Sequence, residues 1–234
     1  GIPELREAIA FKTKRDTGLE ITSSQVLVTN GGKHAVATAF MTLLNPGDEV
    51  LIPAPYWTTY PEAVYLAGGK PISVMTREAN GFRLTVDELE AARTPKTKLL
   101  VFCSPNNPTG WTLSRQEQSQ ILAHCRRHGI WIVADEVYER LYFAGDAGEC
   151  APSFLDLADP DERLVVVNSF SKSFLMTGWR LGWRCQGALA GPPCPCDWPF
   201  WLFHAGVLDG AGGAVCFLWQ AGLGGGNRAA GCGL

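Results

Sequence analysis

Short apolar runs alternate with amphipathic stretches along residues 1–184 of the chain. The apolar runs predict strands and the amphipathic stretches predict helices, an order typical of an α/β fold with a mostly parallel sheet flanked by helices. Strands are expected at Gln25–Val28, Glu49–Ile52, Lys70–Val74, Lys98–Cys103, Ile130–Ala134 and Leu164–Asn168. Helices are expected at Gly32–Leu44, Trp57–Ala67, Thr85–Ala92 and Ser114–His128.

Two of the expected helices carry a start signal in their side chains. Thr85 and Glu88 have the spacing of a capping box, in which each side chain binds the backbone N–H of the other residue, and so do Ser114 and Glu117. Both helix starts therefore have a physical cause.

Composition narrows the class of protein. The chain has 234 residues and 46% of them are hydrophobic, enough for one substantial core. Its net charge is −3 without a long basic run, so neither nucleic acid nor an anionic membrane surface is an expected partner. No apolar stretch reaches the roughly 18 residues of a membrane span, and no basic-then-apolar leader opens the sequence. A cytoplasmic protein acting on small molecules is expected.

The cysteines do not indicate a metal centre. There are eight of them, but no pair has the CxxC spacing of a zinc site. We therefore expect no metal site.

The last fifty residues differ in composition from the rest. Residues 185–234 are rich in glycine and contain no Lys, Glu, Ser, Thr, Ile, Met or Tyr. Glycine and proline make a packed helix unfavourable there. We interpret residues 1–184 as a domain, and residues 185–234 as a frameshifted or mis-spliced tail or else as a disordered, Gly-rich interaction segment.

One lysine lies in a suggestive position after the last strand. Ser169 and Ser171 precede Lys172, Ser173 follows it directly, and Arg180 comes a few residues later. The carboxyl ends of parallel strands are where open α/β sheets bind ligands. An amine surrounded by hydroxyl groups and a guanidinium suits an aldehyde that bears a phosphate. A surface loop rich in basic residues is the simpler alternative.

Two motifs follow earlier strands. Gly31, Gly32 and Lys33 join the first strand to a helix, and backbone N–H groups at a helix start can bind an anion. Trp57 is expected to open a helix directly after the second strand, where its ring could stack on a flat ligand. An ordinary turn and a core aromatic residue are the alternative readings.

Polar side chains also end two central strands. Asn107 lies in Ser104–Gly110 after the fourth strand, a segment that could equally be a plain turn. Asp135 ends the fifth strand, and a buried carboxylate there requires a cation unless it caps a helix. Tyr138, three residues on, can donate its hydroxyl to a ligand.

In order and spacing, these motifs resemble those of the pyridoxal-phosphate-dependent aminotransferases of class I and II, which have the large domain of fold type I. The resemblance implies that Lys172 holds pyridoxal 5'-phosphate as a Schiff base and acts as the catalytic base. It further assigns the phosphate to Gly32, Lys33, Ser169 and Arg180, the pyridine nitrogen to Asp135, the phenolic oxygen to Asn107 and Tyr138, and the ring face to Trp57. Trp57 and Asn107 are also expected to contact substrate.

The implied activity is transfer of an amino group from an amino acid to a 2-oxo acid in a homodimer. The family's N-terminal segment and small domain, which carries the arginine for the substrate carboxylate, have no counterpart here, so this chain could be inactive. Two alternatives remain: another fold-type I enzyme, such as a carbon–sulfur lyase or decarboxylase, or a non-catalytic truncated product. Tyr56-Trp57 with Tyr60-Pro61 is similar to the bacterial-type aspartate aminotransferase group, but aspartate, aromatic amino acids and alanine all remain possible substrates.

Overall fold

The computed structural model describes residues 1–146, 148–159 and 162–186. The chain divides into two units, Gly1–Ala190 and Gly191–Leu234, and all described residues belong to the first. Of the expected tail, only residues 185 and 186 are described, so the interpretation of the tail lies almost wholly outside them.

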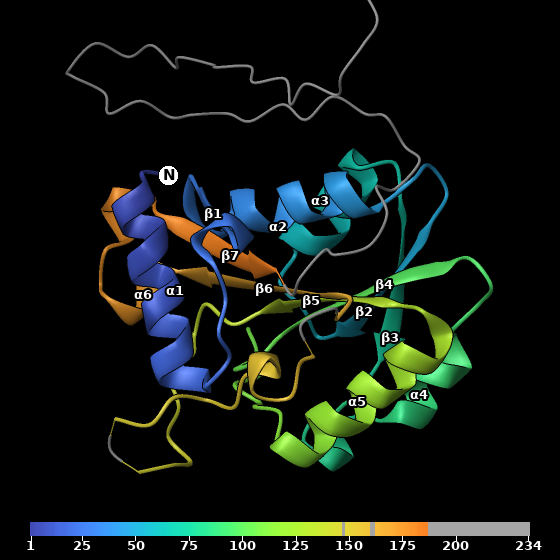
Figure 1. Cartoon of the computed structure of the whole chain (residues 1–234). Helices are drawn as coiled ribbons and strands as arrows, with labels where there is room; N and C mark the ends of the chain where they lie inside the picture. Colours follow the sequence, from blue (N-terminus) through green and yellow to red (C-terminus); the bar gives the residue numbers. More distant parts are fainter. Residues whose placement is uncertain (147, 160–161, 187–234) are drawn as a thin grey trace, which may run out of the picture. The chain divides into compact units, whose positions relative to one another are not determined.

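A seven-stranded sheet forms the centre of the first unit, in the order β1-β7-β6-β5-β4-β2-β3 (Figure 1). The strands are β1 Val26–Thr29, β2 Glu49–Ala54, β3 Lys70–Met75, β4 Thr97–Cys103, β5 Trp131–Asp135, β6 Leu164–Ser169 and β7 Gly182–Gln186. Only β7 among them runs opposite to its neighbours, β1 and β6. The expected mostly parallel sheet is confirmed.

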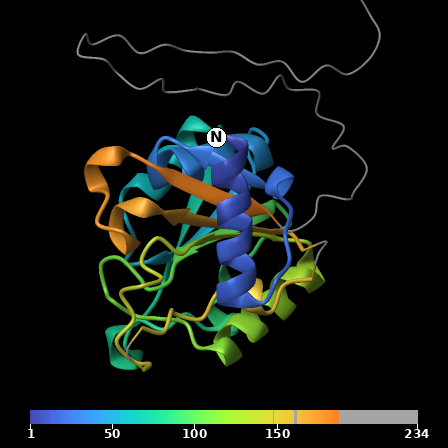
Figure 2. The same ribbon diagram turned by 60° about the vertical axis from the view of Figure 1, so that its left-hand side comes forward.

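Helices cover both faces of the sheet (Figures 1 and 2). One face packs against α2 (Gly31–Leu43) and α3 (Thr59–Leu66) through a core that includes Phe40 and Tyr60. The opposite face packs against α1 (Pro3–Thr17), α4 (Val86–Ala92) and α5 (Arg115–His128). The short helix α6 (Phe170–Ser173) follows β6. Short 3-10 turns lie at Ser23–Gln25, Glu78–Asn80, Phe154–Asp156 and Thr177–Trp179.

The six expected strands and four expected helices are all present with small shifts at their ends. Helices α1 and α6 and strand β7 were not predicted. Helix α1 is mostly polar and buries only Ile9 and Thr13, so it has little apolar stripe. Strand β7 contains Gly, Arg and Gln, and it is held by pairing with β1 and β6 rather than by its own apolar pattern.

The start of α3 corrects one expectation. Trp57 does not open the helix, because the first helical residue is Thr59 and Thr58 is the N-cap. Trp57 instead lies in the preceding loop, where its carbonyl accepts a 3.1 Å hydrogen bond from the N–H of Tyr60.

Both capping boxes are confirmed. The hydroxyl of Thr85 accepts a 3.2 Å hydrogen bond from the N–H of Glu88. The hydroxyl of Ser114 accepts a 3.3 Å hydrogen bond from the N–H of Glu117. Each cap stabilises its helix by about 1 kcal/mol.

The register of the sheet brings several strand ends to one edge. Cys103 at the end of β4 pairs with Asp135 at the end of β5, and Asp135 pairs with Val167 of β6. Ser169 ends β6 opposite Gly182, where β7 begins. Among the described residues, no helix is both long and apolar enough to cross a lipid bilayer.

Candidate active site

A cavity of about 340 Å³ lies at the carboxyl edge of the parallel strands. All of the site residues that the sequence predicted line it: Gly32, Lys33, Trp57, Asn107, Asp135, Tyr138, Ser169, Lys172 and Arg180. They come from the start of α2, the loop before α3, the loop after β4, and the ends of β5 and β6 with the segments that follow them. The fold thus brings together residues that are far apart in the sequence.

A larger cavity of about 520 Å³ is lined by Lys12, Glu136, Glu139, Asn168 and other residues between α1 and the segment 139–156. None of the predicted site residues lines it. The smaller cavity is therefore the candidate active site, because it holds the combination of amine, carboxylate and hydroxyl groups that the sequence indicated.

Asp135 provides a buried carboxylate to the cavity, with only 3% of the residue exposed. Its Oδ2 accepts a 2.7 Å hydrogen bond from the hydroxyl of Tyr60, and Oδ1 accepts a 3.4 Å bond from the N–H of Val137. Burial raises the pKa of Asp135 to about 6, although both hydrogen bonds act in the opposite direction. The carboxylate is therefore mostly charged at neutral pH and suited to binding a cation.

Asn107 and Tyr138 approach each other across the cavity. The Asn107 amide donates a 3.4 Å hydrogen bond to the Tyr138 hydroxyl. Burial raises the pKa of Tyr138, so this hydroxyl stays protonated and able to donate at neutral pH. Together the two side chains offer donors to an oxygen atom of a ligand.

Aromatic and cationic groups meet on another side of the cavity. The Lys33 ammonium lies 5.3 Å from the centre of the Trp57 ring, within the range of a cation–π contact. The Trp57 ring meets that of Tyr60 edge to face, with 5.5 Å between ring centres. Trp57 thus has packing partners on two sides, which restrict the orientation of its ring.

The start of α2 lies very close to β7 and Arg180. Gly31 has a φ of +80°, and a Cβ atom there would lie 2.7 Å from Nη2 of Arg180. A Cβ atom on Gly182 would lie 2.6 Å from the backbone nitrogen of Gly32. Only glycine allows this approach, which brings the first N–H groups of α2 and the Arg180 guanidinium together as a group of donors for an anion.

The segment after β6 supplies further polar groups. The Ser169 hydroxyl caps α6 by accepting a 3.1 Å hydrogen bond from the N–H of Ser171, and it donates to the carbonyl of Leu181 at 3.1 Å. The Thr177 hydroxyl donates to the carbonyl of Ser171. Lys172 and Arg180 are exposed and lie along the cavity wall.

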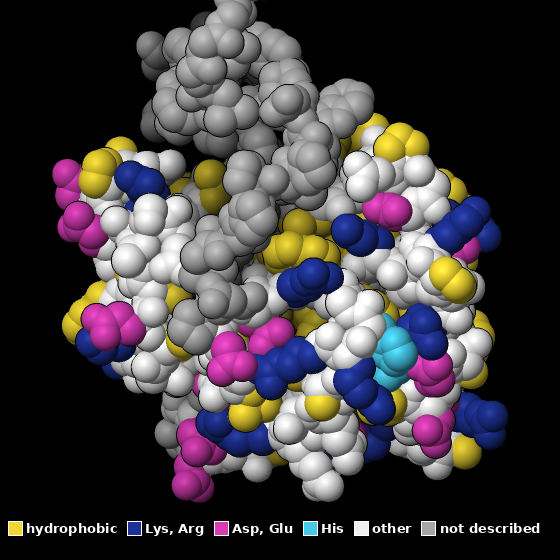
Figure 3. Space-filling model, turned by 45° about the vertical axis from the view of Figure 1, so that its right-hand side comes forward, with side chains coloured by type: hydrophobic (Ala, Val, Ile, Leu, Met, Phe, Trp, Pro, Cys, Tyr) yellow, Lys and Arg dark blue, Asp and Glu magenta, His cyan; other side chains and the backbone are white. Residues whose placement is uncertain are grey.

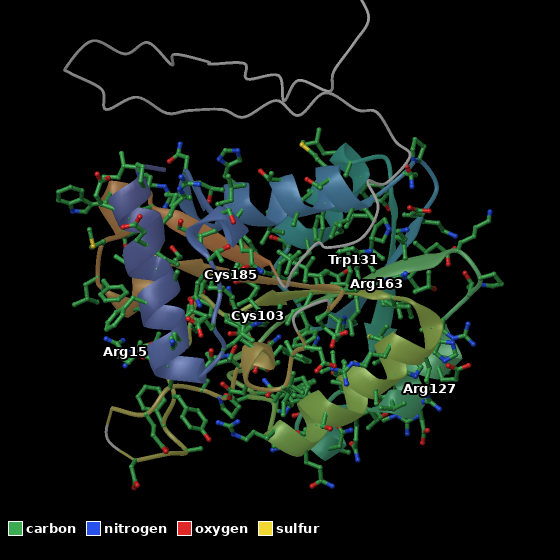
Figure 4. All side chains as sticks on the ribbon, in the orientation of Figure 1. Arg15, Cys103, Arg127, Trp131, Arg163 and Cys185 are labelled. Atoms are coloured by element: carbon green, nitrogen blue, oxygen red, sulfur yellow. The ribbon has the colours of Figure 1, made fainter. Side chains whose placement is uncertain are left out.

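Sequence reasoning missed five residues that also line the cavity: Tyr60, Cys103, Val137, Ser171 and Thr177. Tyr60 is fully buried, and its position three residues after Trp57 was the one signal that could have indicated a shared site. Cys103, labelled near the centre of Figure 4, has its pKa raised well above the ordinary value because it is buried. It is therefore a neutral part of the wall.

The arrangement can bind a flat, anionic ligand with a cationic ring. The N–H groups of α2 and the side chains of Lys33 and Arg180 suit an anion, while Asp135 suits a cation. Lys172 adds an amine that can form a covalent bond to a carbonyl group.

Comparison with known proteins agrees with the family resemblance of the sequence motifs. The profile of the family described as aminotransferase class I and II matches residues 1–186. The chain is similar to an aspartate aminotransferase of Streptomyces avermitilis, with 50% identity over 184 residues that cover 78% of this chain and 44% of that protein. It is also similar to an aspartate/prephenate aminotransferase of Cereibacter sphaeroides, with 46% identity over 193 residues that cover 82% of this chain and 46% of that protein.

Solved structures are similar as well. An aromatic aminotransferase of Pyrococcus horikoshii superposes with a TM-score of 0.74 at 41% identity, covering 79% of this chain and 49% of that one. An aspartate aminotransferase of Thermotoga maritima superposes with a TM-score of 0.75 at 39% identity, covering 80% and 48%. The chain thus spans about half the length of the relatives it matches.

Proposed function

Since the chain belongs to the class I and II aminotransferase family, we propose that it forms the pyridoxal-phosphate-binding part of an enzyme that transfers an amino group from an amino acid to a 2-oxo acid. The observation that carries the proposal is that one cavity is lined by Lys172, by Asp135 and by Gly32 and Lys33 at the start of α2.

The buried carboxylate of Asp135 fits the cofactor's ring nitrogen. Among the described residues, no Lys, Arg or His forms an ion pair with Asp135, and its hydrogen-bond donors, Tyr60 and Val137, are neutral. A protonated pyridine nitrogen would provide the missing positive charge. Asp135 would hold that proton in place, and the ring would then be oriented by the bond between them.

The phosphate would bind at the start of α2. The N–H groups at the start of α2, Lys33 and Arg180 would supply positive charge. The missing side chains of Gly31 and Gly182 leave room for Arg180 and β7 to lie close to the start of α2. Ser169 would contribute its hydroxyl by exchanging one of its present hydrogen bonds for one to the phosphate. Trp57 would cover the ring face, and Asn107 with Tyr138 would bind the phenolic oxygen.

Lys172 is the amine that would anchor the cofactor covalently, and its Nζ could also give or take a proton beside the substrate. When bound, the cofactor would supply an electron-withdrawing ring that stabilises negative charge on the substrate α-carbon. Trp57 and Asn107 are placed in the same cavity, and we propose that they also contact the substrate.

We propose aspartate as the amino donor. The support is that the relatives in Streptomyces avermitilis and Bacillus subtilis are aspartate aminotransferases, at 50% and 45% identity. The name of the relative in Cereibacter sphaeroides adds prephenate as a second compound to test.

Cofactor attachment tests the site. The purified chain is titrated with pyridoxal phosphate, followed by its visible absorbance, reduced with borohydride and digested for mass spectrometry. The label should lie on the peptide that contains Lys172, and Lys172→Ala should abolish it. Lys33→Ala is the matched control: this lysine lines the same cavity, so its loss should weaken binding but leave the label on Lys172. A label that persists in Lys172→Ala would overturn the assignment.

Turnover tests the reaction class separately. Aspartate and 2-oxoglutarate are added to the loaded chain, and oxaloacetate and glutamate are measured. An aminotransferase forms the two products in equal amounts. Labelled Lys172 without either product would mean that the cofactor site is right and that this chain lacks transferase activity.

We also propose a domain boundary near residue 184, a frameshifted tail, a homodimer and a cytoplasmic location. The family profile ends at residue 186, which agrees with a boundary near residue 184, and sequencing the transcript across that point would test the frameshift. A second copy of the chain as partner and a cytoplasmic location rest on the resemblance to the family.

A further inference from the structure

Two histidines and one glutamate form a cluster away from the candidate active site. His124 and His128 lie one turn apart on α5, and Glu90 lies on the neighbouring helix α4. Their potential ligand atoms all lie within 4.8 Å of one another. None of the three residues lines either of the two larger cavities, so the function proposed above does not involve them.

The distances between the carboxylate oxygen of Glu90 and the two imidazole nitrogens are close to those between ligand atoms in a metal site. Oε2 of Glu90 lies 3.4 Å from Nε2 of His128 and 3.8 Å from Nε2 of His124. Zinc binds imidazole nitrogen and carboxylate oxygen at about 2.0–2.1 Å, so neighbouring ligands of a tetrahedral ion are about 3.4 Å apart. Small side-chain rotations would therefore place an ion between the three groups.

His124 gives a second, independent indication. Its side chain is 1% exposed, and among the described residues neither of its ring nitrogens has a hydrogen-bond partner. A buried imidazole without partners is costly, and such groups call for a physical explanation. The ring is packed against that of His128, with 4.8 Å between ring centres, so both histidines face the same space.

We propose that Glu90, His124 and His128 bind a divalent transition-metal ion of the zinc class, which ties α4 to α5. Two imidazoles and one carboxylate suit this class of ion, and the fourth position is left to water. The exposed carboxylate of Glu90 opens the site to ions from solution. Figure 3 shows histidine, acidic and basic side chains next to one another on one face of the molecule.

Arg93 competes with the ion. Its guanidinium donates hydrogen bonds to both carboxylate oxygens of Glu90, at 2.6 and 3.0 Å, and this bond holds the pKa of Glu90 at about 2. Arg127, labelled on α5 in Figure 4, adds positive charge nearby. The ion must displace Arg93 from at least one oxygen, so removing Arg93 should strengthen metal binding.

The test uses Co²⁺ as a spectroscopic probe on the full chain, produced without a polyhistidine tag. Co²⁺ should bind with one ion per chain and give the visible absorbance of a tetrahedral nitrogen and oxygen site, and Zn²⁺ should displace it. Glu90→Gln and His128→Asn should each abolish this absorbance. Both changes are at accessible positions, so loss of folding does not obscure the result.

Two matched variants sharpen the test. His34→Asn removes a histidine of α2 outside the cluster and should leave the absorbance unchanged. Arg93→Gln should raise Co²⁺ affinity by roughly two- to fivefold, the range expected for loss of an exposed ion pair. Absence of binding, a thiolate-to-cobalt absorbance, or equal binding by Glu90→Gln and His128→Asn would each overturn the proposal.

Discussion

The hydroxyl of Tyr60 donates a 2.7 Å hydrogen bond to Oδ2 of Asp135 and so joins α3 to the end of β5 beneath the cavity. Both residues are buried. The bond favours the charged form of Asp135, yet burial outweighs it and holds the pKa at about 6. Tyr60 therefore opposes the effect of burial and increases the negative charge that Asp135 can offer a ligand near neutral pH.

Tyr60→Phe should lower the free energy of unfolding by about 1–3 kcal/mol at pH 8, because a buried carboxylate then loses a donor. The loss should be smaller at pH 4.5, where Asp135 is protonated. Urea unfolding at the two pH values measures the difference. Tyr56→Phe is the matched control, since Tyr56 makes an exposed hydrogen bond to Ser73. An equal loss at both pH values would contradict the role given to Tyr60.

Asp135→Asn should stabilise the chain without cofactor at neutral pH. The folded pKa of Asp135, about 6, is above the ordinary 3.8, so its contribution to stability is complete below pH 3.8 and is lost as the pH rises through 6. Asparagine does not ionise, and the variant should be more stable by up to about 3 kcal/mol at pH 8. The gain should disappear at pH 3.5, which unfolding in urea can verify.

The same variant should bind pyridoxal phosphate more weakly, because no carboxylate then pairs with the ring nitrogen. Stability and binding would thus change in opposite directions. If Asp135→Asn instead lowers the stability at pH 8, burial of the Asp135 charge is not the dominant contribution to stability at this position.

The sequence predicted the cavity residues well because each followed a strand that could be recognised locally. The apolar run before Asp135 and the one before Ser169 are both buried strands, and their carboxyl ends share one edge of a parallel sheet. The capping boxes at Thr85 and Ser114 also depend only on neighbouring residues. Local patterns were enough for these features.

Other features depend on pairing between distant segments and were missed. Tyr60 meets Asp135 across 75 positions of sequence, and β7 is held between β1 and β6. The five residues of β7, Gly-Trp-Arg-Cys-Gln, are too few and too mixed to give a clear periodic signal. The cluster of Glu90, His124 and His128, which we propose as a metal site, joins two helices and has no cysteine, so cysteine spacing gives no sign of it.

The buried carboxyl group of Glu136 leads to a further prediction about the pH dependence of stability. Burial raises its pKa to about 8 from an ordinary 4.5, while its carboxyl oxygens accept hydrogen bonds from the Ser153 hydroxyl at 2.7 Å and the Phe154 N–H at 3.0 Å. Its contribution to stability is complete below pH 4.5 and is lost as the pH rises through 8.

Glu136→Gln keeps the shape of the protonated acid and does not ionise. Between pH 6 and 8 the wild-type chain should lose up to about 1.4 kcal/mol per pH unit relative to this variant. Urea unfolding at pH 6, 7 and 8 measures the divergence. Parallel pH dependence of the two proteins would mean that Glu136 is already ionised in the folded state.

The close approach of β7 to the start of α2 leads to the last prediction. A Cβ atom on Gly182 would lie 2.5 Å from the carbonyl carbon of Gly31 and 2.6 Å from the nitrogen of Gly32. These are backbone atoms of a helix start, so they cannot move aside as a flexible side chain can. Gly182→Ala should therefore cost about 1–3 kcal/mol of stability. It should also weaken binding of pyridoxal phosphate, because the displaced N–H groups no longer converge on the phosphate.

Gly178→Ala is the matched control: no atom lies within 4 Å of its Cβ position, so stability and cofactor binding should change little. Titration with inorganic phosphate separates the two effects, since a folded Gly182→Ala chain that binds phosphate as well as the wild type would show that the anion site lies elsewhere in the cavity.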